Sequence, residues 1–154
     1  MPDNLNFRPA AIADLPQIVE MLADDFLGKQ RERFESPLPE SYLRAFEEIE
    51  CDQNNELIVV EQNGEIIGTL QLTFIPSISF QGGKRAQIES VRVAASVRGQ
   101  GIGKKMFEWA IERAREKNCR MIQLSTNNDR ADAQRFYENL GFKASHVGMK
   151  LYLT

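Results

Sequence analysis

The amino-acid sequence predicts a mixed α/β fold in which helices cover the faces of a sheet. Two observations carry this prediction. Residues 56–75 hold two apolar, β-branched runs on either side of Asn63-Gly64, the pair that a tight type I′ hairpin turn prefers. From Gly101 onward the apolar residues recur at helical spacing, and a short apolar run and a second helical segment follow.

Composition favours one soluble globular domain. The chain has 154 residues, of which 42% are hydrophobic and 27% charged, so we expect a single domain over 1–154. The net charge of -3 gives no general reason to expect a nucleic-acid partner. No signal peptide or membrane-length apolar run is visible, so we expect a cytoplasmic protein without membrane contact. Cys51 and Cys119 form no CxxC and only one histidine is present, so we expect free thiols and no metal.

The N-terminal third predicts two helices. Asp14 can cap the first helix, and Pro16 lies in its first turn, where a missing N–H costs little. Apolar residues follow at helical spacing, and Gly28 is the expected stop. A charged, proline-broken connection leads to a second helix from about 40 to 49.

The middle of the chain predicts strands, and the last third predicts helices and strands in alternation. After the hairpin we expect a third strand over 85–94, which completes a meander. A helix then runs from Gly101 to Lys117-Asn118, and "RMIQLST" forms a short strand. "ADAQRFYENLGF" predicts a helix that stops at Leu140-Gly141, and "HVGMKLYL" predicts a closing strand.

The stretch "SVRGQGIGKK" predicts an anion site between the third strand and the following helix. Glycines let an anion approach the backbone without a clash with Cβ, and a helix start offers unpaired N–H groups. Arg98 and Lys104 add positive charge. A P-loop is excluded because GxxxxGK[ST] does not occur, and the GxGxxG fingerprint fails because Lys104 takes the place of the third glycine.

The pattern that remains is Arg-x-x-Gly-x-Gly, formed by Arg98, Gly101 and Gly103. It resembles the pyrophosphate-binding motif of the GNAT superfamily of N-acetyltransferases. "IESVRVAASVRGQGIGKKMFEWAIERA", "RADAQRFYENLGF" and "FRPAAIADLPQIVEML" look like the strand, loop and helices of that family in register. The resemblance implies a single mixed, mainly antiparallel sheet of about six to seven strands, splayed between the fourth and fifth, with about four flanking helices.

The resemblance implies that acetyl-CoA is the co-substrate and that acetyl passes directly to a primary amine. The pantetheine arm would pair with the backbone around Val91 and Val93. The pyrophosphate would lie on a set of backbone amides: Arg98, Gly99, Gln100, Gly101, Ile102, Gly103 and Lys104.

Two residues are the candidates for proton transfer. Tyr137 matches the family position of the general acid that protonates the leaving thiolate; the alternative is a core aromatic with a satisfied hydroxyl. Glu89 is the candidate base, acting directly or through water, and the alternative is an exposed sheet glutamate. In a regular strand Glu89, Val91 and Val93 share one face, where partial desolvation would raise a carboxyl pKa; a bulge would invert this parity.

One position departs from the commoner family pattern. Many members carry an asparagine seven residues before the tyrosine, and this sequence has Arg130 there. We expect Arg130 to bind a CoA phosphate or the pantetheine arm instead. His146 could line the acceptor pocket or be structural.

The acceptor is left open by the sequence. Acidic and basic residues both occur in the region of the first two helices, so charge does not select the amine. The short chain favours a small-molecule amine, with protein N-termini or lysines as the alternative. A non-catalytic acyl-CoA sensor and another phosphate-ligand binder are rival functions. A homodimer is expected by analogy only.

Overall fold

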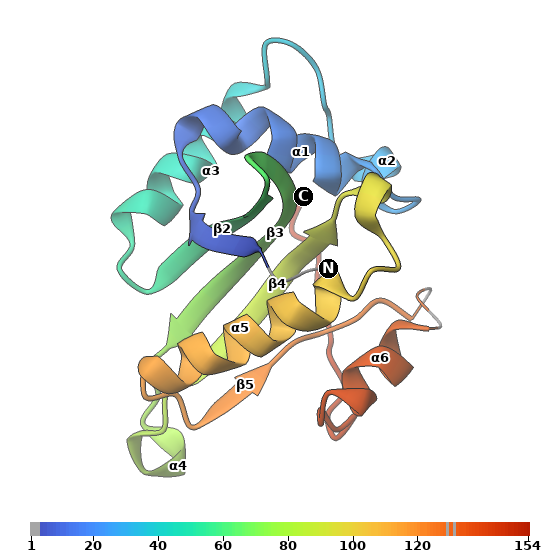
Figure 1. The fold of residues 1–154 in the computed structure, drawn as a ribbon. Coiled ribbons are helices and arrows are strands. Elements are labelled where there is room, and N and C mark those ends of the chain that lie inside the picture. Colours follow the sequence, from blue (N-terminus) through green and yellow to red (C-terminus); the bar gives the residue numbers. More distant parts are fainter. Residues whose placement is uncertain (1–3, 129, 131) are drawn as a thin grey trace. The chain divides into compact units, whose positions relative to one another are not determined.

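The computed structural model describes residues 4–128, 130 and 132–154, and Met1, Pro2, Asp3, Asp129 and Ala131 lie outside the described residues. The chain divides into two compact units, Met1–Gln123 and Leu124–Thr154. Figure 1 labels helices α1 to α6 and strands β2 to β5.

The first unit contains one five-stranded sheet with the order β1-β2-β3-β4-β5. Its strands are β1 (Leu5–Pro9), β2 (Asn55–Gln62), β3 (Glu65–Ile75), β4 (Arg85–Val93) and β5 (Met121–Gln123). The first four pair antiparallel, and β5 pairs parallel to β4. The mixed, mainly antiparallel sheet is therefore confirmed, whereas the strand number among the described residues is lower than expected. The hairpin turn is confirmed as well, with φ of 52° at Asn63 and 80° at Gly64.

The helices of this unit are η1 (Ile12–Asp14), α1 (Leu15–Ala23), α2 (Gly28–Arg31), α3 (Glu40–Cys51), α4 (Ser79–Gly82), η2 (Ala95–Val97) and α5 (Ile102–Glu116). Helices α1, α3 and α5 follow the sequence expectations, with two differences in the first of them, whereas the four short helices were not predicted. The first helix ends at Ala23 rather than at Gly28. Asp14 makes no side-chain cap, because its carboxylate instead accepts the Ala11 N–H at 2.7 Å and both Nη atoms of Arg8.

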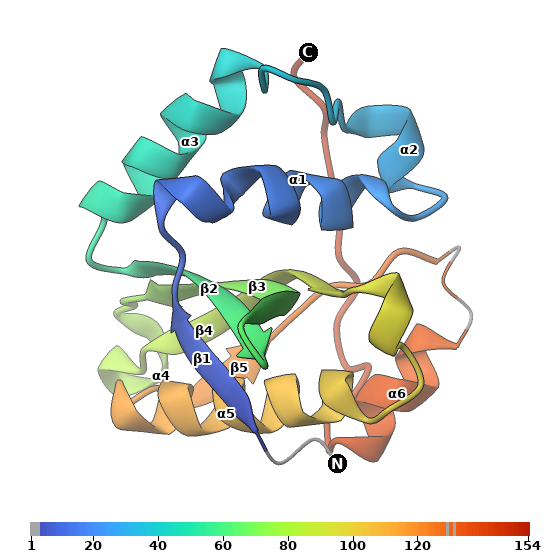
Figure 2. The same ribbon diagram turned by 45° about the horizontal axis from the view of Figure 1, so that its top comes forward.

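The two faces of the sheet carry different helices. A Cβ added at Gly68 would lie 2.9 Å from Sδ of Met106, so the face that contains Gly68 lies against α5. On the opposite face Leu15, Val19 and Phe46 form a buried cluster from α1 and α3. Figure 2 shows the sheet between α5 on one side and α1 with α3 on the other.

The second unit contains α6 (Ala133–Asn139). Its predicted start at Ala131 lies outside the described residues, and Gly141 after the helix has φ of 100°. The strand predicted over 146–153 is wrong, because the structure places those residues in no strand. Val147, Met149 and Leu151 are 84–91% exposed. Alternating apolar residues make a strand only where a neighbouring strand supplies hydrogen bonds.

Candidate functional site

A β-bulge interrupts β4 at the predicted base. Glu89 pairs with Gln71 and Arg92 with Thr69, so Ser90 and Val91 together oppose one residue of β3. Ser90 has φ of 56°, in the left-handed region. The extra residue inverts the alternation, and Glu89 therefore lies on the opposite face from Val93. The expectation that these two share a face is wrong for this reason.

Glu89 lies on the α1 face of the sheet. The same face carries Arg92, whose Nε lies 3.4 Å from the carboxylate of Asp25, just beyond α1. The Glu89 side chain is exposed, so the expectation of a partly desolvated carboxylate among β-branched neighbours is wrong. The bulge turns it away from Val93, and the carboxylate is open to water and to ligands.

The pairing between β4 and β5 ends early. It runs from Arg85 and Met121 to Gln87 and Gln123, whereas β4 continues to Val93. The two strands are therefore hydrogen-bonded only at the start of β4, as in a sheet that opens between its fourth and fifth strands. The segment with Val91 and Val93 therefore lies beyond the part of β4 that pairs with β5.

The glycine loop joins β4 to α5. Gly99 and Gly101 have φ of 79° and 78°, a region that residues with a Cβ rarely adopt. By helix geometry the N–H groups of Ile102, Gly103 and Lys104 have no acceptor within α5. Residues 98–101 and Lys104 are exposed. The loop thus presents backbone donors to the solvent at the positive end of a helix dipole.

Arg98 connects this loop to two other elements. Its Nε donates to the backbone oxygen of Val93 at 3.3 Å. Its Nη2 donates to the backbone oxygen of Asp24 at 3.3 Å and lies 3.4 Å from the Asp24 carboxylate. The role of Asp24 as a counter-ion was missed by sequence reasoning, because the two residues are 74 positions apart and no local pattern joins them.

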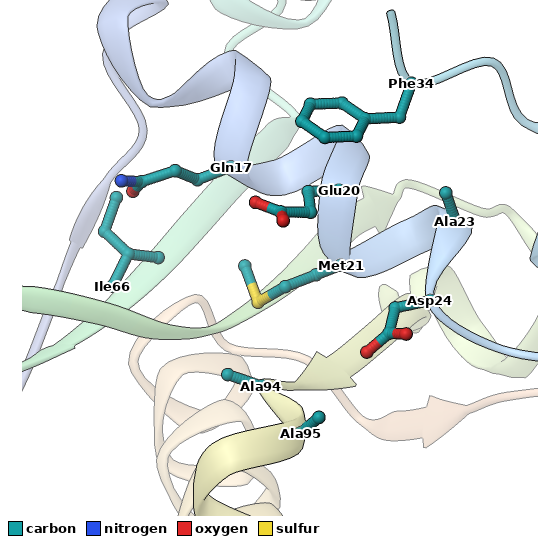
Figure 3. A pocket seen from close by; sticks show the side chains of 9 residues that line it. All are labelled: Gln17, Glu20, Met21, Ala23, Asp24, Phe34, Ile66, Ala94 and Ala95. Carbon is teal, nitrogen blue, oxygen red and sulfur yellow. The ribbon is translucent and has the colours of Figure 1, made fainter.

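A cavity of about 490 Å³ lies beside the end of α1 (Figure 3). Its lining comprises Gln17, Glu20, Met21, Ala23, Asp24, Phe34, Ile66, Ala94 and Ala95. Two carboxylates, from Glu20 and Asp24, line it. Glu89 is not part of the lining, and the strand rise places its Cα roughly 15 Å from that of Ala94. The cavity therefore lies where β4 leads into η2 and not at the predicted base.

Polar side chains continue along β4 on the Glu89 face. Arg85, Gln87 and Glu89 alternate with Ala86 and Ile88, which are buried on the α5 face. Gln123 Nε2 donates to Gln87 Oε1 at 2.7 Å. Sequence reasoning missed this row, although the alternation in "RAQIE" was its visible signal.

On the neighbouring strands, Gln71 and Thr73 of β3 share that face and both donate to Oδ1 of Asn55. The polar row therefore continues across the sheet from β4 to β2.

The remaining candidates belong to the second unit. Tyr137 lies in α6, half-buried, with its ring centroid 5.5 Å from that of Phe136 and 6.2 Å from that of Phe142. Arg130 forms a turn into α6, since its N–H donates to Asn127 and its carbonyl accepts from Ala133. His146 is exposed, and its Nδ1 lies 2.7 Å from Oγ of Ser145.

Within residues 4–128, 130 and 132–154, no cluster of three or more His, Cys, Asp or Glu side chains is arranged to hold a metal ion. Among the same residues, no helix has the length and apolar character needed to cross a bilayer. Cys51 and Cys119 are both free thiols.

Two curated relatives of this chain are named N-acetyltransferases. The aminoalkylphosphonate N-acetyltransferase of Salmonella typhimurium is 35% identical over 62% of this chain, and the glucosamine 6-phosphate N-acetyltransferase of Trypanosoma brucei brucei is 33% identical over 60%. Each match spans 61% of the relative's own length.

A crystal structure described as a transcriptional regulator from Bacillus halodurans C-125 is 56% identical, with a TM-score of 0.94, and the match covers 97% of this chain and 100% of that one. Residues 16–142 match the model of the acetyltransferase (GNAT) family. This range of the chain contains the β4 bulge, the glycine loop and α6. The chain therefore belongs to the GNAT family of acetyltransferases.

Proposed function

We propose that the protein is an acetyl-CoA-dependent N-acetyltransferase that acts on the primary amine of a small molecule. The observation that carries this proposal is the order of three features in one stretch: the bulged strand with Glu89, the glycine loop with Arg98, and the exposed start of α5. The two relatives named as acetyltransferases of an aminoalkylphosphonate and of an amino-sugar phosphate support a small-molecule amine.

The glycine loop is the proposed pyrophosphate site. The backbone amides of Arg98 to Lys104 donate to the phosphate oxygens, and the left-handed glycines keep that surface free of Cβ atoms. Arg98 adds a charge-assisted hydrogen bond. The pantetheine arm pairs with the backbone of Val91 and Val93, beyond the part of β4 that β5 covers. Arg130 binds a CoA phosphate or the pantetheine arm.

The proposed chemistry is direct attack of the amine on the thioester. The acceptor ammonium loses a proton to Glu89, through water, since this carboxylate is exposed. The neutral amine nitrogen then forms a bond to the acetyl carbon while the carbon–sulfur bond breaks, and the nitrogen loses its second proton to water, which leaves the neutral amide. Tyr137 gives its proton to the departing thiolate and regains a proton from solvent, which completes the cycle.

Binding and turnover test the proposal separately. Acetyl-CoA should raise the melting temperature, whereas ATP and NAD should not. Glu89→Gln and Tyr137→Phe should lower kcat at least about tenfold with little change in acetyl-CoA affinity. Glu65→Gln and Tyr152→Phe are matched controls, because both side chains are exposed and lie outside the proposed site. Unchanged turnover in either test variant would remove that residue from the mechanism.

A second candidate function is an acyl-CoA sensor on the same fold. The observation that favours it is the 56% identity to the Bacillus halodurans protein described as a transcriptional regulator. Tight acetyl-CoA binding without thiol release in the presence of any amine would favour the sensor. Thiol release that depends on an amine would favour the enzyme.

A further inference from the structure

Arg85 is a half-buried cation on the same face of β4 as Glu89. Its pairing with Ile75 is in register with the pairs Thr73–Gln87 and Gln71–Glu89, so the three β4 side chains leave the sheet on one side. Arg85 is half-buried, and its Nε is fully buried. That Nε donates to no acceptor among the described residues.

An unsatisfied buried guanidinium donor is unusual in a folded protein. Buried polar groups are almost always hydrogen-bonded, and one left without a partner costs roughly 1–3 kcal/mol. Within the described part of the chain, no carboxylate lies in ion-pair distance of Arg85, whereas Arg92, farther along the same strand, meets Asp25. The group that would satisfy Arg85 is an oxyanion, because a guanidinium donates to carboxylate or phosphate oxygens in a matching fork.

The residues between Arg85 and Glu89 suit a polar ligand. Gln87 accepts from Gln123 through Oε1, and an amide nitrogen carries two donors of its own. The four-residue separation along the strand places the Cα atoms of Arg85 and Glu89 about 13 Å apart. Both side chains leave the same face of the strand, so an acceptor that lies along β4 would place its amine toward Glu89 and an anionic group toward Arg85.

We propose that the acceptor amine carries an oxyanionic group and that Arg85 binds this group and so determines acceptor specificity. This inference rests on the proposed acetyltransferase function. The amine lies at Glu89, the anion at Arg85, and Gln87 and Gln123 hydrogen-bond the part between them. The carboxylates of Glu20 and Asp24 do not oppose this arrangement, because they line the cavity beside Ala94, at the other end of β4.

A matched acceptor series tests the charge preference. Release of CoA thiol is measured with 2-aminoethylphosphonate, β-alanine, ethanolamine and 1,3-diaminopropane, and with glucosamine against glucosamine 6-phosphate. We expect kcat/KM at least about tenfold higher for an anionic acceptor than for its neutral counterpart, as one charge-assisted hydrogen bond provides. The phosphonate and β-alanine arms show which oxyanion is preferred. Equal or better turnover of the neutral or dicationic amines would overturn the inference.

The residue assignment is tested by Arg85→Gln. The loss should appear in the KM of the anionic acceptor, at least about tenfold, while the KM of acetyl-CoA and turnover of ethanolamine stay unchanged. Arg85→Lys should restore part of the loss. Arg120→Gln is the control, because it removes the same charge from an exposed side chain immediately before β5. An equal loss for all acceptors, or the same loss in the control, would show that Arg85 has no role in specificity.

A binding measurement separates failure of this inference from failure of the proposed function. Calorimetric titration of 2-aminoethylphosphonate into the protein with CoA bound should give a signal that Arg85→Gln abolishes, while the melting temperature and the stabilisation by CoA persist. If no amine releases thiol but this binding is seen, the enzyme proposal fails and the anion site stands. If amines are acetylated without regard to charge, only the anion site fails.

Discussion

Arg98 of the glycine loop and Asp24 at the end of α1 form a double contact. Nη2 of Arg98 lies 3.3 Å from the Asp24 backbone oxygen and 3.4 Å from its carboxylate, and both side chains are about half exposed. The contact holds the guanidinium beside the amides that are proposed to bind pyrophosphate. A phosphate bound at the loop and the Asp24 carboxylate would therefore compete for the hydrogen bonds of the Arg98 guanidinium.

Arg98→Gln should weaken acetyl-CoA binding by about 10- to 100-fold, since a hydrogen bond to a charged group is worth roughly 1.5–3 kcal/mol. Asp24→Asn should leave the affinity equal or higher, because it removes a competing anion and keeps Arg98. Calorimetric titration measures both. Arg44→Gln, which breaks an exposed ion pair on α3, is the control. Weaker binding in the control than in Arg98→Gln would contradict the role of Arg98.

The two glycines of Gly-x-Gly should separate stability from binding. Gly101→Ala forces a residue with a Cβ into φ of 78° and should destabilise the fold by about 1–2 kcal/mol. Gly103 lies within α5, where alanine is preferred by roughly 0.5–1 kcal/mol, so Gly103→Ala should not lower the melting temperature. Its added Cβ should nevertheless weaken acetyl-CoA binding. Unchanged binding in Gly103→Ala would contradict a close approach of the ligand to this amide.

Asp14 should contribute to stability at neutral pH. The hydrogen bonds from Arg8 are the main cause that holds the pKa of the Asp14 carboxyl below its ordinary value of 3.8. Because the pKa is lowered in the folded protein, this stability is fully present when the pH is above the ordinary carboxyl pKa. It is lost as the pH falls through the folded-state pKa. Asp14→Asn should therefore cost about 1.5–3 kcal/mol in denaturant unfolding at neutral pH.

The difference between Asp14→Asn and the unaltered protein should shrink as the pH falls below the ordinary carboxyl value. Glu40→Gln is the comparison, because its exposed pair with Arg44 should be worth less than about 1 kcal/mol. A difference for Asp14→Asn that stays constant down to acid pH would show that the ion pair is not its source.

The two thiols should differ in reactivity. Burial raises the pKa of the Cys119 thiol, which lowers its thiolate fraction, whereas Cys51 is exposed. Iodoacetamide should therefore modify Cys51 first, and Cys51→Ser should leave a slowly reacting protein. Mass spectrometry over time measures both rates. Equal rates at the two sites would contradict the burial of Cys119.

Local patterns predicted the elements whose geometry is local. The Asn63-Gly64 turn was predictable because both positions adopt a positive φ that this pair favours. Helix α5 was predictable because its buried residues repeat at helical spacing. The loop that follows β4 was identified through the spacing of Arg98, Gly101 and Gly103.

Features that depend on distant partners were not predictable from local patterns. The bulge at Ser90 is defined by register against β3, and it reversed the expected face of Glu89. The closing strand failed because an alternating pattern does not supply a neighbouring strand. The Arg98–Asp24 contact and the solitary Arg85 Nε follow from the packing of segments far apart in the sequence.

Coupled product analysis tests the acetyltransferase proposal most directly. Acetyl-CoA and the amine panel are incubated with the protein, and CoA thiol is measured together with the N-acetylated amine by mass spectrometry. The proposal predicts equal amounts of thiol and acetylated amine, with both reduced in Glu89→Gln and Tyr137→Phe. Stabilisation by acetyl-CoA without any acetylated amine would contradict it.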